Sequence, residues 1–277
     1  MLVNVLLLIK SVIMGIVEGV TEFLPISSTG HLILVGHLIG FESAFAKQLF
    51  EIVIQLGAIL AVVVLYRKKI FKSFHSLRPG GEGFRLWSGI VLAFIPSGIV
   101  GVLFNSKVEK YLMRPVTVAL ALLVGGLWMI YAERRYRKNS RVKRIDDVSY
   151  RQAFVIGLFQ CLSILWPGFS RSASTIIGGW IMGLSTVAAA EFSFFLAIPS
   201  MFCASGYSLV KSFKTGMVLS GWEVLALIIG FVVSFLVALI VVKKFIDFLK
   251  HRPMKGFAYY RIVVGVVILV MVLFRLF

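Results

Sequence analysis

Two short stretches of this chain carry polar side chains of the kinds that bind and cleave phosphate groups. Their members are Glu18, Glu22, Ser27, Ser28, Thr29 and His31 in the first stretch and Ser170, Arg171, Ser172 and Thr175 in the second. Carboxylates bind divalent cations, a guanidinium binds phosphate oxygens, and hydroxyl or imidazole groups act as nucleophiles or bases. Together these groups are typical of phosphoryl transfer, in which positioning and charge stabilisation supply most of the catalysis.

The two glutamates of the first stretch are four residues apart, so on a helix they share one face. Two like charges there repel each other and need a bound cation, a proton or a nearby arginine to offset them. Ordinary surface acids at a hairpin end are the alternative. Because they precede a Pro-Ile-Ser-Ser-Thr-Gly turn inside an apolar segment, we expect Glu18 and Glu22 to hold a divalent metal, or Glu22 to activate the nucleophile.

The hydroxyl run after the glutamates suits a helix start, where free backbone N–H groups bind anions. Ser27 and Thr29 are predicted to bind the substrate, although such residues are also ordinary helix caps. His31 could act as general base, general acid or nucleophile. The sequence does not choose between Ser28, His31 and a water molecule as the attacking group.

Arg171 is the only basic residue between Arg151 and Lys211. An arginine in such an apolar segment needs an anion, either a phosphate or a carboxylate. A salt bridge to a glutamate of the first stretch is the structural alternative, and the two partners can alternate as substrate binds and leaves. The neighbouring hydroxyls of Ser170, Ser172 and Thr175 are predicted to bind substrate oxygens.

The composition places the chain in the membrane class. Of its 277 residues 59% are hydrophobic, against about 45–50% in soluble domains. The net charge of +17 comes from Lys and Arg in short loops between apolar runs, which is typical of a polytopic protein facing anionic lipid rather than of a nucleic-acid-binding protein.

Six apolar segments approach the length of about 20 residues that a bilayer requires. They are residues 46–66, 84–104, 115–132, 187–210, 222–242 and 258–276. Two other apolar segments, 1–40 and 153–185, are each interrupted near the middle by Pro, Gly, Ser and Thr. Irregular backbone at membrane depth must be buried in protein or line a polar cavity, so the interruptions indicate a site.

Lys and Arg concentrate in three loops, which the positive-inside rule places in the cytoplasm. Residues 67–85 hold six, residues 134–151 hold eight and residues 243–261 hold six. With these loops on one side, segment 1–40 must enter and leave from the outside, and segment 153–185 from the cytoplasm. Both are therefore predicted to be re-entrant hairpins.

The two halves of the chain share a spacing pattern. The matched positions are Gly15, Glu18, Pro25 and Ser28 in the first half and Gly157, Gln160, Pro167 and Ser170 in the second. We expect a single membrane domain, 1–277, built as an inverted repeat of about 1–135 and 150–277, with the site on its pseudo-two-fold axis.

The stretches 18–31 (Glu-Gly-Val-Thr-Glu-Phe-Leu-Pro-Ile-Ser-Ser-Thr-Gly-His) and 167–175 (Pro-Gly-Phe-Ser-Arg-Ser-Ala-Ser-Thr) resemble the two signatures of the undecaprenyl-diphosphate phosphatase family of the bacitracin-resistance type. The resemblance extends over essentially the whole chain. It implies an all-α fold of ten helices, of which six span the bacterial inner membrane and four form two re-entrant pairs. It also implies a site that opens to the outside face.

The same resemblance implies hydrolysis of undecaprenyl diphosphate to undecaprenyl phosphate and inorganic phosphate, which recycles the carrier lipid for peptidoglycan synthesis. It implies Mg²⁺ or Ca²⁺ as cofactor. The functional positions that it carries over are Glu18, Glu22, Ser28, His31, Ser170, Arg171 and Thr175.

A transporter or flippase for a lipid phosphate or small anion is the alternative, because inverted repeats with broken helices are also transporter architecture. Paired glutamates and a histidine on one hairpin favour hydrolysis, since binding an anion needs only the arginine. The sequence contains no HExxH, Walker A or GxSxG motif. It leaves the oligomeric state, a homodimer included, open.

Overall fold

The computed structural model describes residues 2–43, 45–214 and 218–277. Over these residues the protein is all helical, with eleven α-helices and no β-strand, as the sequence predicts. The helices are α1 (Leu2–Thr21), α2 (Ser28–Leu38), α3 (Glu51–Leu65), α4 (Arg67–His75), α5 (Glu82–Tyr111), α6 (Pro115–Tyr136), α7 (Tyr150–Leu165), α8 (Arg171–Ile181), α9 (Thr186–Lys214), α10 (Gly221–His251) and α11 (Lys255–Leu273). The expected number was ten, and the extra helix is α4.

Helix α4 lies in the basic segment that the sequence analysis treats as a loop. Ser73 accepts a hydrogen bond from the indole Nε1 of Trp87 at 2.8 Å, and Phe74 stacks on the same indole with ring centroids 5.0 Å apart. Lys68 and Lys72 are exposed whereas Ser73 is buried, so the segment is amphipathic and folds against the start of α5.

Six helices are long and apolar enough to cross a membrane: α1, α5, α6, α9, α10 and α11. The number agrees with the prediction, but the set differs by one member. The predicted span 46–66 is divided into a π-helical turn, Ala46–Phe50, and the 15-residue helix α3. Conversely, α1, which the sequence analysis assigns to a hairpin, has the length and composition of a span.

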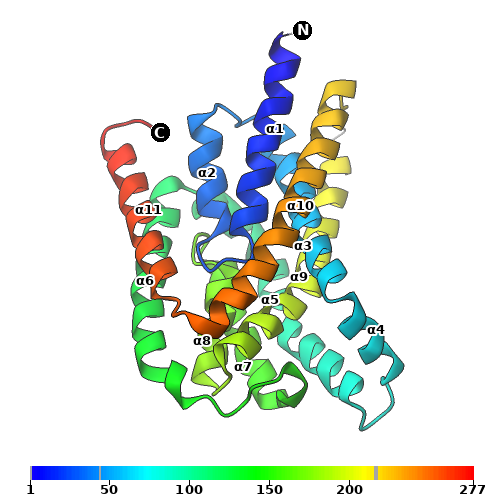
Figure 1. Cartoon of the computed structure of the whole chain (residues 1–277). Coiled ribbons are helices and arrows are strands. Elements are labelled where there is room, and N and C mark those ends of the chain that lie inside the picture. The colour runs from blue at the N-terminus through cyan, green and yellow to red at the C-terminus, as the bar shows by residue number, and fades with distance from the viewer. Residues whose placement is uncertain (1, 44, 215–217) are drawn as a thin grey trace.

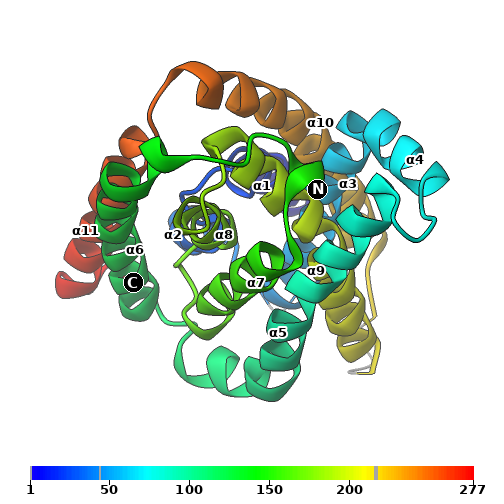
Figure 2. The ribbon, with the colours of Figure 1, turned by 90° about the horizontal axis from the view of Figure 1, so that it is seen from below.

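The interrupted segments form two helix–turn–helix units. In Figure 1, α1 runs down from the N-terminus and α2 runs back up, whereas α7 and α8 lie in the lower part of the molecule. Seen from below, α2 and α8 coincide at the centre and the other helices are arranged around them (Figure 2). The two views together place α2 and α8 end to end, with the starts of both helices toward the middle.

The three basic loops lie at one end of the molecule. Lys69 pairs with Asp146 at 3.1 Å, and the guanidinium of Arg137 donates to the carbonyl of Arg252 at 3.1 Å, so each loop contacts its neighbour. Both chain termini lie at the opposite end (Figure 1). This agrees with the predicted grouping of the basic loops on a single side.

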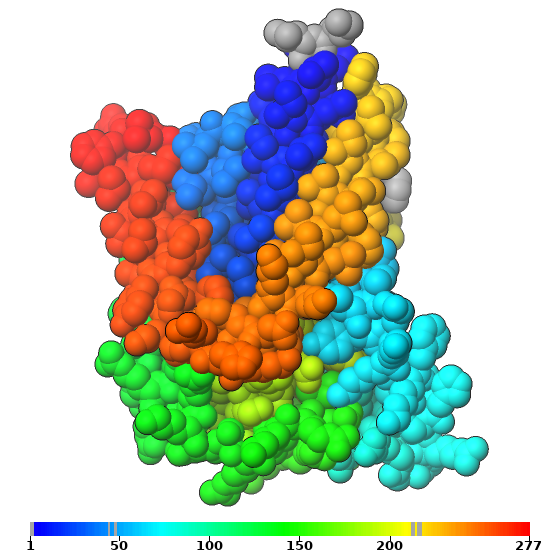
Figure 3. Space-filling model, in the orientation of Figure 1, coloured from blue at the N-terminus to red at the C-terminus, as the bar shows by residue number. Residues whose placement is uncertain are grey.

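Small residues allow the interrupted helices to pack closely on long ones. A Cβ on Gly15 of α1 would lie 2.8 Å from the carbonyl oxygen of Gly230 in α10. A Cβ on Gly157 of α7 would overlap the carbonyl of Ala93 in α5. Such contacts are typical of helix association in membranes. Figure 3 shows α1 and α10 side by side along the surface.

Candidate active site

The turns that interrupt the two helical units have matching backbone geometry. Ser27 caps α2 and Ser170 caps α8, and both adopt the left-handed conformation, with φ of 71° and 73°. The Ser27 hydroxyl accepts from the N–H of Gly30 at 3.3 Å, and the Ser170 hydroxyl accepts from the N–H of Ala173 at 3.2 Å. Positive φ is strained for serine, and strain of this kind gathers at functional sites.

This geometry corrects the spacing match of the sequence analysis by one residue. The residue that matches Ser170 in backbone conformation is Ser27, not Ser28. Two residues separate Pro167 from its cap, Ser170, whereas one residue separates Pro25 from its cap, Ser27. Gly168, with φ of 96°, absorbs the longer turn. Ser28 and Arg171 are consequently the first residues of α2 and α8, and both side chains start from a helix N-terminus.

An ion pair joins the two turns. Arg171 Nη2 lies 3.2 Å from Glu22 Oε1, and the other carboxylate oxygen, Oε2, accepts a hydrogen bond of 2.6 Å from the Ser28 hydroxyl. Arg171 Nη1 donates to the carbonyl of Ser193 at 3.0 Å. The salt bridge that the sequence analysis gives as the structural alternative for Arg171 is therefore confirmed, and together with the hydrogen bond from Ser28 it brings Glu22, Ser28 and Arg171 to one place.

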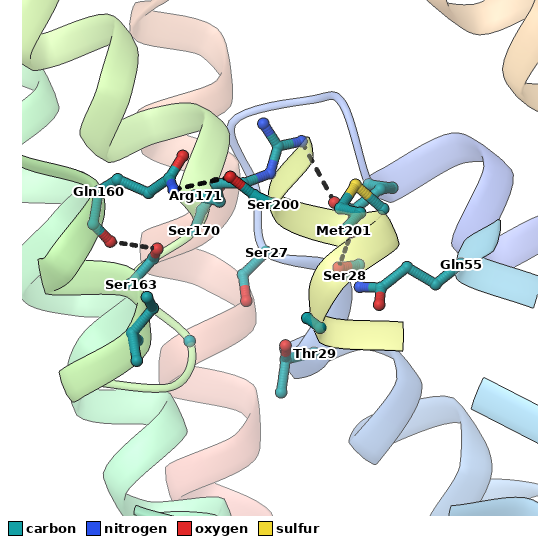
Figure 4. Close-up of a pocket in the computed structure, with 14 residues that line it drawn as sticks. Ser27, Ser28, Thr29, Gln55, Gln160, Ser163, Ser170, Arg171, Ser200 and Met201 are labelled. Carbon is teal, nitrogen blue, oxygen red and sulfur yellow. Dashed lines mark hydrogen bonds and ion pairs between the residues drawn. The ribbon is translucent and has the colours of Figure 1, made fainter. Parts of the chain in front are cut away.

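A cavity of about 200 Å³ opens beside this ion pair. The predicted site residues that line it are Glu22, Ser27, Ser28, Thr29, Ser170 and Arg171. These side chains come from both turns, and Figure 4 shows those of Ser27, Ser28, Thr29, Ser170 and Arg171 around a common space. The caps already accept from the N–H groups of Gly30 and Ala173, but the helix N-termini of α2 and α8 still direct their positive dipole ends toward the cavity, which suits an anion.

Four polar residues that the sequence analysis did not assign to the site also line the cavity: Gln55, Gln160, Ser163 and Ser200. The Gln160 amide donates to the hydroxyls of Ser97 at 2.6 Å and Ser200 at 3.0 Å. Gln160 had appeared only as the repeat partner of Glu18. A buried glutamine at the position that matches a predicted metal ligand was the available signal.

Glu18 lies one helical turn before Glu22, and the N–H of Glu22 donates to the carbonyl of Glu18 at 3.0 Å. The helical register thus continues through both glutamates, as predicted. The Glu18 side chain is 1% exposed, and neither carboxylate oxygen has a hydrogen-bond partner among the described residues. A buried carboxylate without a partner is costly, and a bound cation would supply the opposite charge that the carboxylate lacks.

His31, which the sequence analysis gives as a candidate base, acid or nucleophile, is buried and does not line the cavity. Its Nδ1 lies 2.7 Å from the carbonyl of Ser27, and its Nε2 lies 2.9 Å from the hydroxyl of Tyr260. A carbonyl oxygen only accepts, so Nδ1 carries the proton and Nε2 accepts from Tyr260 when the imidazole is neutral. Both nitrogens are therefore engaged within the protein.

Two further predicted substrate-binding residues, Ser172 and Thr175, are fully buried and do not line the cavity. The Ser172 hydroxyl donates to the carbonyl of Phe23 at 2.8 Å, which ties α8 to the first turn. The Thr175 hydroxyl lies 2.7 Å from that of Ser193, beside the carbonyl that Arg171 contacts. Both hydroxyls therefore stabilise the site from positions that are buried outside the cavity.

The fold and the cavity define a polytopic membrane protein with a polar site between its two interrupted helical units. Residues 11–267 match the family described as Bacitracin resistance protein BacA. The chain belongs to this family. It is 53% identical over 272 residues to a protein of Clostridium tetani (strain Massachusetts / E88), with 98% of each chain covered, and 54% identical over 266 residues to a protein of Thermoanaerobacter sp. (strain X514), with 96% and 97% covered. Both relatives are named undecaprenyl-diphosphatase.

Ser172→Ala tests the supporting role of the buried hydroxyls. The variant leaves the carbonyl of Phe23 without this donor, and we expect the free energy of unfolding to fall by roughly 1–2 kcal/mol. Ser174→Ala is the matched control, because the Ser174 hydroxyl is also buried but donates only to Arg171 O in its own helix, a carbonyl that Thr175 contacts as well. Reversible unfolding in mixed micelles measures both, and equal losses would contradict the assigned contact.

Proposed function

We propose that this protein hydrolyses undecaprenyl diphosphate to undecaprenyl phosphate and inorganic phosphate, and thereby recycles the carrier lipid for peptidoglycan synthesis. Relatives of about half-identical sequence over nearly the full chain are named for this activity. The observation that carries the proposal is the Arg171–Glu22–Ser28 chain of contacts, which places a guanidinium, a carboxylate and a hydroxyl on one cavity. The transporter alternative accounts for the arginine but not for the hydroxyl bonded to a carboxylate.

Arg171 binds the diphosphate in this account. A guanidinium presents paired N–H donors to phosphate oxygens, and the starts of α2 and α8 add backbone donors on either side. In the substrate-free protein Glu22 takes the place of the phosphate at 3.2 Å from the guanidinium. Since the diphosphate carries more negative charge than a single carboxylate, its binding displaces the Glu22 carboxylate from Arg171. Glu22 stays bonded to Ser28.

Ser28 is the group best placed to attack. Its hydroxyl already donates to Glu22 and lines the cavity, whereas both nitrogens of His31 are engaged. The Ser28 oxygen bonds to the terminal phosphorus as its proton passes to Glu22, and the bond to the bridging oxygen breaks so that undecaprenyl phosphate leaves with the electron pair. Glu22 then loses this proton to solvent. A water molecule attacks the phosphorus of the phosphoserine as its proton passes to Glu22, the bond between phosphorus and Ser28 Oγ breaks, Glu22 returns the proton to Oγ, and inorganic phosphate leaves.

A divalent cation fits the carboxylates of this site. Among the described residues no three His, Cys, Asp or Glu side chains group closely enough to hold a metal alone. Mg²⁺ is commonly held by one or two carboxylates together with substrate phosphates and water, so Glu18 and Glu22 suffice in the presence of the diphosphate. The orphaned oxygens of Glu18 support this assignment. A bound cation would offset negative charge on the phosphates.

We also propose that the domain is an inverted repeat whose two hairpins are re-entrant, with the basic loops in the cytoplasm and the site open to the outside. Support comes from the paired caps Ser27 and Ser170 and from corresponding contacts: α1 packs on α10 as α7 packs on α5. The basic end carries Lys69 and Arg137, and the termini lie at the other end. In this arrangement the site opens to the outside face of the membrane, from which the undecaprenyl diphosphate would enter.

Phosphate release from undecaprenyl diphosphate by the purified protein in detergent tests the activity. We expect Arg171→Ala and Glu22→Ala each to lower kcat by about 10²–10³-fold, because each removes a charge that contacts the reacting groups. Addition of EDTA is expected to stop release, and Mg²⁺ or Ca²⁺ to restore it. Arg85→Ala, which removes an exposed partner of Asp147, is the control and keeps the wild-type rate. A well-folded wild type without activity would overturn the proposal.

Acid quenching during turnover tests the nucleophile. If Ser28 attacks, phosphate from the terminal position becomes covalently attached to a peptide that contains Ser28, and Ser28→Ala abolishes the adduct. Mass spectrometry after proteolysis locates the modified residue. A phosphohistidine at His31, or no adduct in a protein that turns over normally, would instead assign the attack to His31 or to water.

A further inference from the structure

Arg261 is an arginine that the sequence analysis counts among the basic loop residues and that the structure buries completely. It lies in α11 and its relative exposure is 0%. Its guanidinium donates to the carbonyls of Phe169 at 2.7 Å, of Gly168 at 3.3 Å and of Pro25 at 3.3 Å. Pro25 belongs to the turn before α2, and Gly168 and Phe169 belong to the turn before α8. One side chain therefore bonds both turns of the site.

The charge of Arg261 has no counter-ion within the described residues. Its acceptors are backbone carbonyls, the fourth being Ala121 at 3.3 Å, and its Nε has no hydrogen-bond partner. The guanidinium also lies over the Phe169 ring, 5.8 Å from the centroid. A buried charge without an opposite charge is costly in a membrane domain and indicates a functional role. The anion that the turns are built to receive is the missing complement.

The helix opposite Arg261 makes room for the guanidinium. A Cβ on Gly125 of α6 would overlap Nη2 of Arg261. The nearest neighbours of a Cβ on the adjacent Gly126 would instead be Ile262 Cγ1 at 2.8 Å and the carbonyl oxygen of Ala258 at 3.0 Å. Helices α6 and α11 lie side by side at the edge of the domain in Figure 2. The absence of a side chain at residue 125 thus serves the position of the arginine, and not only close helix packing.

We propose that Arg261 is a positioning residue for hydrolysis of the diphosphate: it holds the two turns in register so that Ser28 and Arg171 face one cavity, and its positive charge favours the anion-loaded site. This inference rests on the proposed function. Arg261 itself does not line the cavity, so it acts through the backbone of both turns. The neighbouring Tyr260 fixes His31 from the same helix, so α11 orients both the caps and the imidazole.

The test compares kcat and KM of wild type, Arg261→Gln, Arg261→Lys, Gly125→Ala and Gly126→Ala, each normalised to monodisperse, helical protein. We expect Arg261→Gln to lower kcat by about 10²-fold, the scale of a misplacement of about 1 Å. Arg261→Lys should recover part of it, roughly tenfold, because it keeps the charge without the planar fork. Gly125→Ala should lower kcat at unchanged charge, and by more than Gly126→Ala, which perturbs the same helix pair away from the guanidinium.

Three outcomes are distinguishable. If wild type does not release phosphate, the proposed function is overturned, and this inference, which rests on it, is overturned with it. If wild type is active and Arg261→Gln loses thermal stability while its kcat stays within about threefold of wild type, Arg261 is merely structural and the inference is overturned. If Arg261→Gln does not fold, the glycine pair decides: equal kcat in Gly125→Ala and Gly126→Ala overturns the inference, and a selective loss in Gly125→Ala supports it.

Discussion

A guanidinium and a carboxylate from residues 149 positions apart form an ion pair where the two interrupted helical units meet. In a membrane domain it is costly to bury Arg171 or Glu22 without an opposite charge, so each unit stabilises the charged residue of the other. The pair also sets the chemistry, because the same carboxylate bonds Ser28 and the same guanidinium is the natural ligand of a phosphate. In the proposed mechanism, stability without substrate and affinity for substrate therefore depend on one contact.

The surrounding structure supplies the irregular backbone that this contact needs. Ser27 and Ser170 take a conformation that serine disfavours, and the turns around them expose carbonyls that no helix satisfies. Arg261 bonds carbonyls of both turns, and Ser172 bonds the first turn from the second unit. The strained turns are thus held from behind by buried donors, which leaves the cavity face of each turn free for an anion.

Local patterns predicted the helical class and the shared face of Glu18 and Glu22, and they offered the pairing of Arg171 with a glutamate as the alternative to phosphate binding. They failed where three-dimensional packing decides. The match of Ser28 with Ser170 was off by one residue, because spacing does not reveal which residue ends a turn. Gln160 reached the cavity unpredicted, and the contact of His31 with Tyr260 joins residues 229 positions apart. The sequence analysis counted Arg261 among the basic loop residues, because composition does not show where a side chain points.

The most direct test of the central ion pair is a double-mutant cycle with Glu22→Gln, Arg171→Gln and the double variant, measured as the free energy of unfolding without substrate. Each single change leaves one charge of this pair without its partner, whereas the double change removes both charges. We predict a coupling energy of roughly 1–3 kcal/mol, with the double variant more stable than the sum of the single losses implies. Additive losses would show that the two units do not depend on this pair and would contradict the account.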